Sequence, residues 1–181
     1  WFVPVALAAA YYFLPKILGK PVSNYYLASL GFWWLAVTSA FAGGSRLIGA
    51  PVPVWIPTLG IVANMLVVVG VVVVALNLFG TLSGRYAAAR ASLTLRFILV
   101  SLVGFALAAV MNLALSMRSF AAIVQFTLLD GLRDWLTFYA CFSTAMFGAV
   151  YFMLPRLTGR EWRFTGLIKL HFGTTVLGVV L

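Results

Sequence analysis

The segment LVVVGVVVVAL, residues 66–76, contains eleven consecutive residues without a polar or charged side chain. It lies inside a longer stretch without charges, residues 47–84. About 20 apolar residues cross a membrane as a helix, because the hydrocarbon core is ~30 Å thick and a helix rises 1.5 Å per residue. A strand of a membrane barrel would alternate polar and apolar residues, whereas this run is apolar on every face. The stretch therefore predicts a transmembrane helix.

The composition of the whole chain agrees with a membrane protein. Its 181 residues are 64% hydrophobic and 8% charged, and the mean hydropathy is +1.11. A soluble domain carries about 25% charged residues, and a disordered chain combines low hydrophobicity with high charge. Both classes are excluded, and the expected fold is an all-α polytopic transmembrane helix bundle. One cysteine excludes an internal disulfide.

Runs without charges predict about six spans, near 1–15, 27–43, 59–82, 97–117, 135–154 and 169–181. The prolines at 51, 53 and 57 are expected to delay the third helix until residue 59. The apolar segment 119–129 is too short to span and predicts an interfacial or re-entrant piece. Both ends of the chain fall inside apolar runs, so we expect residues 1–181 to form one transmembrane domain of a longer subunit.

The cations are unevenly distributed. Lys and Arg number 12 against three Asp and Glu, which gives a net charge of +9. The first, third and fifth connections between spans carry nine cations: Lys16, Lys20, Arg85, Arg90, Arg96, Arg156, Arg160, Arg163 and Lys169. The positive-inside rule places these connections in the cytoplasm. Membrane lipids and other membrane subunits are therefore the expected partners, and nucleic acid is not.

Few residues carry recognisable chemistry. The sequence contains no P-loop, CxxC or HExxH motif. Asp130, Arg133 and Asp134 form a mixed-charge cluster, which is either an interfacial anchor or a paired cluster in a pocket. His171, the only histidine, cannot build a multi-histidine metal site alone, and Cys141 is expected to pack as a small apolar residue.

Seven short motifs follow one another along the chain. They are YYFLPK (11–16), LASLGFWWL (27–35), AGGSRLIGAPVPVW (42–55), TLSG (81–84), LRFILVSL (95–102), FGAVYFMLPRLTGRE (147–161) and LHF (170–172). Their order and spacing resemble the catalytic subunit, subunit I, of C-family (cbb-type) haem–copper oxidases. The resemblance runs over all 181 residues. It implies a respiratory electron-transport protein of a bacterial inner membrane, in which haem b and copper reduce oxygen, or nitric oxide in close relatives.

The same resemblance implies where the ligands should lie, and this sequence departs from the family there. The copper-binding histidines fall on Ser45 and Arg46, the active-site tyrosine on Ser39, the two axial histidines on Arg133 and Trp135, the glutamate on Met111, and a histidine–tyrosine pair on Gln125 and Phe126. Trp55 and His171 are retained as scaffold. Arginine stays protonated and cannot ligate a metal. We therefore predict no catalytic residue, and no haem or copper bound through these positions.

These departures favour a non-catalytic, oxidase-like subunit with a structural or docking role in a larger, possibly respiratory, membrane complex. A salt bridge from Arg46 to Asp134 or Asp130 would fill the former site with compensated charge, and the alternative is that Arg46 extends to the interface. An active oxidase or nitric oxide reductase with displaced ligands is one other hypothesis. A transporter or proton channel is another, and its candidate polar residues are Asn64, Asn77, Asn112, Ser101, Thr137, Ser143 and Thr144.

Overall fold

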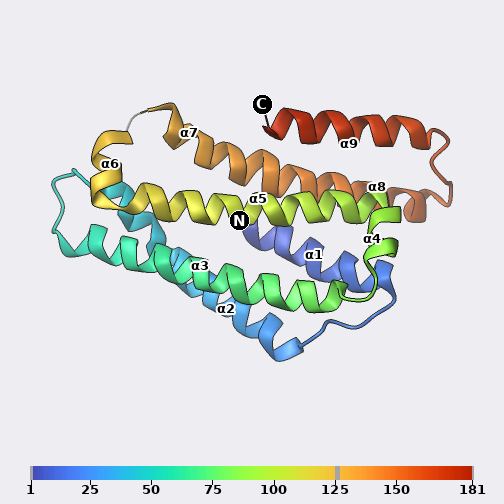
Figure 1. Cartoon of the computed structure of the whole chain (residues 1–181), viewed down its shortest axis with the longest axis horizontal. Helices are drawn as coiled ribbons and strands as arrows, with labels where there is room; N and C mark the ends of the chain where they lie inside the picture. The colour runs from blue at the N-terminus through green and yellow to red at the C-terminus, as the bar shows by residue number, and fades with distance from the viewer. Residues whose placement is uncertain (1, 125–126, 181) are drawn as a thin grey trace.

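The computed structural model describes residues 2–124 and 127–180, and every regular element in them is a helix (Figure 1). The elements are α1 Phe2–Leu18, α2 Tyr25–Ala42, the 3₁₀ helix η1 Gly43–Leu47, α3 Trp55–Leu82, α4 Tyr86–Ala91, α5 Leu93–Ser116, α6 Arg118–Val124, α7 Leu128–Trp135, the π-helix η2 Leu136–Ser143, α8 Thr144–Thr158 and α9 Thr165–Val180. The expected all-α fold is confirmed.

Four helical segments are long and apolar enough to cross a membrane. They are Tyr25–Leu47, Trp55–Leu82, Leu93–Ser116 and Leu128–Thr158. The apolar helices α1 and α9 are shorter, with 17 and 16 residues. The long helices lie roughly along one direction, as a polytopic membrane bundle requires (Figure 1).

Two helices continue past the prolines that were expected to end them. The first reaches Leu18 and not residue 15, and α8 reaches Thr158 and not residue 154. Each stops at a glycine with positive φ, 61° at Gly19 and 64° at Gly159. A proline near the end of a helix costs few hydrogen bonds, whereas a left-handed glycine reverses the chain and ends the helix.

Two helices begin earlier than expected, for different local reasons. Helix α3 starts at Trp55 and not at residue 59, because Pro57 lies in the first turn, where a backbone N–H has no partner within the helix. Helix α5 starts at Leu93 and not at residue 97. The Ser92 hydroxyl accepts the Leu95 N–H at 3.4 Å and caps this helix.

The charged cluster lies on a helix and not in a connection. Helix α7 begins at Leu128 and continues through η2 into α8, so the span expected from residue 135 starts seven residues earlier. The segment 119–129 contributes α6 and the start of α7. Within η2 the Ser143 hydroxyl donates to the Phe138 carbonyl at 2.8 Å, five residues back. Such π-helices commonly occur at functional sites.

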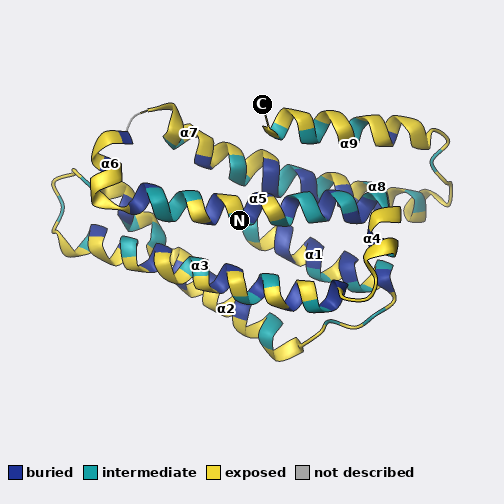
Figure 2. Cartoon of the chain, in the orientation of Figure 1, coloured by how far each residue is buried: buried dark blue, intermediate teal, exposed yellow. Residues whose placement is uncertain are grey.

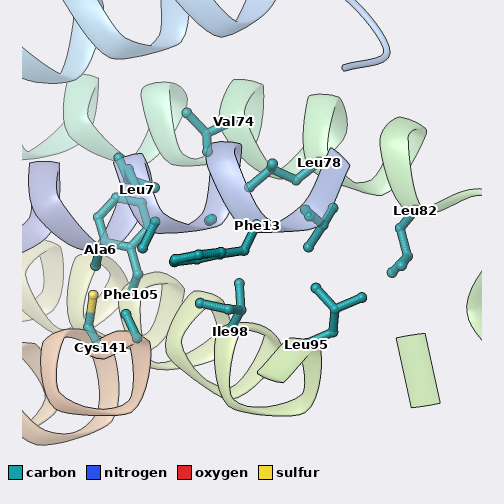
Figure 3. Packing of buried hydrophobic residues seen from close by; sticks show 14 of the residues in the cluster. Ala6, Leu7, Phe13, Val74, Leu78, Leu82, Leu95, Ile98, Phe105 and Cys141 are labelled. Atoms are coloured by element: carbon teal, nitrogen blue, oxygen red, sulfur yellow. The ribbon is translucent and has the colours of Figure 1, made fainter. Parts of the chain in front are cut away.

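The buried core is built around α1. Phe13 of α1 packs between Val74 and Leu78 of α3 on one side and Ile98 of α5 on the other, and Leu7 lies beside Phe105 of α5 (Figure 3). Cys141 of η2 joins this core as a small buried residue. Helix α1 therefore contacts both α3 and the α5–α8 side of the bundle, and α3 and α5 also contact each other directly.

Helices α2 and α3 approach closely through glycines. A Cβ on Gly31 would lie 2.9 Å from Val74, and a Cβ on Gly70 would lie 2.7 Å from Leu35. The Trp34 indole N–H also donates to the Leu66 carbonyl at 2.7 Å. Membrane helices associate through such small residues and interhelical hydrogen bonds. The outer faces of both helices are exposed and apolar (Figure 2).

Gly104 provides a test of this packing. A Cβ at this position would lie 2.6 Å from the Ala140 carbonyl carbon of η2. We expect Gly104→Ala to lower the free energy of unfolding by about 1–3 kcal/mol, because neither backbone can yield easily. Thermal unfolding of the detergent-solubilised protein measures the loss. In the control, Gly173→Ala, nothing lies within 4 Å of the new Cβ, so a similar loss there would contradict the packing argument.

Candidate functional site

A cavity of about 620 Å³ opens near the ends of α2 and α7. Its apolar wall includes Leu7, Leu35, Val67 and Phe105. Its polar lining consists of Ser39, Ser45, Arg46, Asn64, Asn112, Arg133, Asp134 and Thr137. A smaller cavity of about 160 Å³ shares Ser45, Arg46, Arg133 and Asp134 and adds Asp130. The volume of the larger cavity lies in the range typical of small-molecule and cofactor sites.

The structure brings together some of the positions at which the family resemblance places ligands. Ser39, Ser45, Arg46 and Arg133 all line the larger cavity. Met111 does not line it, whereas its neighbour Asn112 does. Trp135 lines a separate open depression beside Tyr139, with the two rings 3.9 Å apart. Gln125 and Phe126 lie outside the described residues.

A close backbone contact places Ser45 and Arg46. A Cβ on Gly60 of α3 would collide with the Ser45 nitrogen, and a Cβ on Gly44 would lie 2.9 Å from the Ile56 carbonyl oxygen. The Asn64 amide donates to the Ala42 carbonyl at 3.1 Å and to the Ser45 hydroxyl at 3.0 Å. These contacts fasten η1 to α3, so the Arg46 side chain starts from a fixed point beside the cavity.

Ion pairs connect the described charged residues of the site. Arg46 Nη2 lies 3.0 Å from Asp134 Oδ1, and Arg133 Nη2 lies 2.6 Å from Asp130 Oδ1. Arg133 Nε also lies 3.6 Å from Asp134 Oδ1, which links the two pairs. Asp130 pairs with Arg133 and not with Arg46. The four charges sum to zero, and they join η1 to α7 across 88 residues of sequence.

The two arginines have different surroundings. The Arg46 side chain is 56% exposed, whereas that of Arg133 is 9% exposed. Arg133 Nε is buried and has no hydrogen-bond partner. A buried cation is costly unless it is paired, so Arg133 depends on its carboxylates far more than Arg46 does.

Most of the polar residues that are candidates for a transport path already form hydrogen bonds within the bundle. Ser101, Thr137, Ser143 and Thr144 donate to backbone carbonyls on α7 or η2, and Asn64 donates to three oxygens at the η1–α3 contact. Asn77 accepts the Asn24 N–H at 3.1 Å. Among these seven described side chains, Asn112 alone has no hydrogen bond in the structure, and it lines the cavity.

The residues retained as scaffold lie elsewhere. His171 Nδ1 and the Tyr151 hydroxyl are 2.8 Å apart, and the imidazole packs 4.7 Å from the Phe147 ring centroid. His171 of α9 thus contacts Tyr151 and Phe147 of α8 and Phe97 of α5. Trp55 is exposed at the start of α3. Neither residue lines the cavity.

The donor set around the cavity does not fit a haem–copper centre. Neutral imidazole nitrogens are the usual ligands of haem iron and copper. At the positions where the family resemblance places imidazoles, this chain has the Ser45 hydroxyl, the guanidiniums of Arg46 and Arg133, and the Trp135 indole. Within residues 2–124 and 127–180, no group of three or more His, Cys, Asp or Glu residues could hold a metal ion. A guanidinium beside such a centre would also repel the metal cation.

Comparison with known proteins identifies the scaffold. The family described as Cytochrome C and Quinol oxidase polypeptide I matches residues 1–181. The chain belongs to this family. The resemblance found in the sequence motifs, and the oxidase-like bundle expected from it, are therefore confirmed.

Curated relatives in the subunit I family include a cbb3-type subunit. The chain is 29% identical over 182 residues to the Cbb3-type cytochrome c oxidase subunit CcoN1 of Stutzerimonas stutzeri, which covers 97% of this chain and 37% of that protein. It is 29% identical to cytochrome c oxidase subunit 1 of Rhodobacter capsulatus, covering 97% of this chain and 33% of that protein. The chain thus spans about a third of the length of these relatives.

Sequence reasoning missed three features of this site. It did not foresee the π-helix η2, although Thr137 and Phe138 of this helix line the cavity. It did not connect Asn64 with Ser45, although an asparagine inside an apolar run signals a specific partner. It also did not distinguish buried Arg133 from exposed Arg46, because that difference arises from tertiary packing.

The difference between the two arginines is testable. We expect Asp130→Ala to lower the free energy of unfolding by about 2 kcal/mol, because it removes the closest partner of a buried guanidinium. Arg46→Ala should cost less than about 1 kcal/mol, because Asp134 is half exposed and can be hydrated. Denaturant titration of both variants provides the comparison. Equal losses would show that Arg133 does not depend on Asp130.

Proposed function

We propose that this chain belongs to a haem–copper-oxidase-like membrane subunit that performs no redox chemistry at this cavity and has a structural or docking role in a larger membrane complex. The observation that carries the proposal is the linked set of ion pairs, Arg46–Asp134 and Arg133–Asp130. Of these residues, Arg46 and Arg133 occupy positions where the family resemblance places copper and haem ligands. The subunit would then be a pseudoenzyme with a degenerate active site.

The physical argument rests on the charges. A guanidinium has five N–H donors and no lone pair for a metal. Asp130 is already bonded to Arg133 at 2.6 Å, and Asp134 to Arg46 at 3.0 Å. Binding a metal at these carboxylates would strand both cations beside it. The neutral network therefore supports a site without haem or copper.

The scaffold supports a role in assembly. The contacts of Gly44 with Ile56 and of Gly104 with Ala140 use no metal, so the bundle packs without one. Exposed apolar faces cover much of α2, α3 and α9 (Figure 2). Such faces contact lipid or neighbouring membrane helices. The relatives are named as oxidase subunits, which supports the proposal that other membrane subunits are the partners of this chain. The bacterial inner membrane would be the location of this complex.

An active oxidase or nitric oxide reductase with displaced ligands is the competing hypothesis. The decisive measurement is a pyridine haemochrome assay with a copper determination on the full-length protein, purified beside a full-length cbb3-type subunit as positive control. We expect the positive control to contain haem, and this protein to contain well below one haem and one copper per chain.

Assembly is measured in the same preparation. Purification from native membranes in mild detergent should retain membrane subunits at fixed stoichiometry, and these should dissociate without loss of the fold of this chain. Haem bound at one equivalent per chain through residues of this segment would overturn the non-catalytic proposal. Recovery of the chain as a monomer only would overturn the docking role.

A further inference from the structure

Three helices finish in the same way at one end of the bundle. Helices α1, α3 and α8 each lead into a glycine with positive φ followed by a cation: Gly19–Lys20, Gly84–Arg85 and Gly159–Arg160. The segments LPKILGK (14–20) and LPRLTGR (154–160) share the whole pattern of Leu, Pro, cation, two residues, Gly and cation. All three helices end at the right of Figure 1, opposite α6 and α7. The repeat therefore places cations on one face.

The cations at this end have no carboxylate partners. Nine Lys and Arg residues lie in these connections or in the helix ends beside them, with Glu161 as the only acidic residue among them. In the described part of the chain, the ion pairs all involve Arg46 or Arg133, at the opposite end. This surface is therefore strongly positive, and it needs anions from outside the chain.

Two of the cations share one aromatic ring. The Arg156 guanidinium lies 3.4 Å from the centroid of the Phe152 ring, and Lys16 Nζ lies 5.9 Å from the same centroid. Phe152 is buried and packs on Phe13 of α1, with centroids 4.9 Å apart. Both cations are exposed. The α1–α8 seam thus holds two like charges around one ring, and an anion bound there would be attracted by both.

We propose that Lys16 and Arg156 bind the phosphate of an anionic phospholipid at this seam. The Tyr12 hydroxyl lies 2.6 Å from Lys16 Nζ and positions the ammonium, and Arg156 Nη1 is fixed by the Phe152 carbonyl at 2.8 Å. One turn deeper in the membrane, exposed Tyr12 and Met153 offer apolar surface to acyl chains. Cations between helices at the cytoplasmic side attract the acidic headgroups of lipids.

The apolar surface distinguishes a lipid from a soluble anion. A free phosphate would gain the two charges alone, whereas a lipid also gains contact with Tyr12 and Met153. Phosphatidylcholine offers the same acyl chains, but its headgroup has no net charge. The proposal therefore predicts a preference for phosphatidylglycerol over both ligands.

Native mass spectrometry of the delipidated full-length protein tests the site, with phosphatidylglycerol added in detergent. We expect one tightly bound lipid, and about 30-fold weaker binding in the Lys16→Gln/Arg156→Gln double variant, because each near-surface cation contributes about fivefold. The matched control is Arg163→Gln/Lys169→Gln, which removes the same charge from the same end and should lose clearly less. The exchange variant Lys16→Arg/Arg156→Lys keeps both charges and should keep binding.

Several outcomes would overturn the proposal. Equal losses in the two Gln double variants would show a diffuse charge effect and no site at the seam. Equal binding of phosphatidylcholine would show that the acyl chains alone are recognised. Displacement of the lipid by inorganic phosphate at equal concentration would assign the site to a soluble anion. A melting temperature unchanged in the Gln double variant at the seam excludes misfolding as the cause of lost binding.

Discussion

The burial of one guanidinium constrains the cavity end of this bundle. Arg133 is a cation with 9% of its side chain exposed, and such a group must be compensated by charges of opposite sign. Asp130, one turn earlier on α7, lies at 2.6 Å, and Asp134 lies 3.6 Å from Arg133 Nε. The second carboxylate is then shared with Arg46, which brings η1 into the same network. Arg46 and Arg133 stand where the family resemblance puts metal ligands, and the neutral set of four charges ties η1 to α7, which are far apart in the sequence.

The close contacts between helices do not involve these ion pairs. Gly44 and Gly60 bring η1 against α3, and Gly104 brings α5 against the π-helix η2. These contacts are between backbones. Membrane helices associate by this kind of close approach, so exchanging cavity side chains leaves the bundle in place. Membership of the subunit I family therefore fixes the architecture and leaves the chemistry of the cavity to be argued from its residues.

The predictable part of the fold is the part that depends on hydrophobicity along the chain. Long apolar runs located the spans, because a helix of fixed rise must cross a core of fixed thickness. The ends of the spans were wrong by several residues at Pro15 and Pro155, where left-handed Gly19 and Gly159 end the helices, and at Trp55, where proline is tolerated in the first turn. The π-helix η2 and the burial of Arg133 could not be predicted from composition, because both follow from how α5 and α7 pack. The motif order located Ser39, Ser45, Arg46 and Arg133 at one cavity, whereas Met111 and Trp135 fall outside it.

The cations at the two ends of the bundle are compensated in different ways. At the cavity end Arg46 and Arg133 are paired with carboxylates of the same chain, and Arg118 donates to the Thr58 hydroxyl. At the other end the cations lie at or near helix ends and most of them are exposed, so solvent and headgroups can compensate them. Helix dipoles add to this difference, because the C-terminal ends of α1, α3 and α8 favour cations. Among the described residues, Lys16 and Arg156 are the two cations at that end that lie near the same buried ring, Phe152. The two positive charges therefore have fixed places at the α1–α8 seam, in addition to the general excess of cations in the connections. Such fixed charges favour the binding of one specific anion.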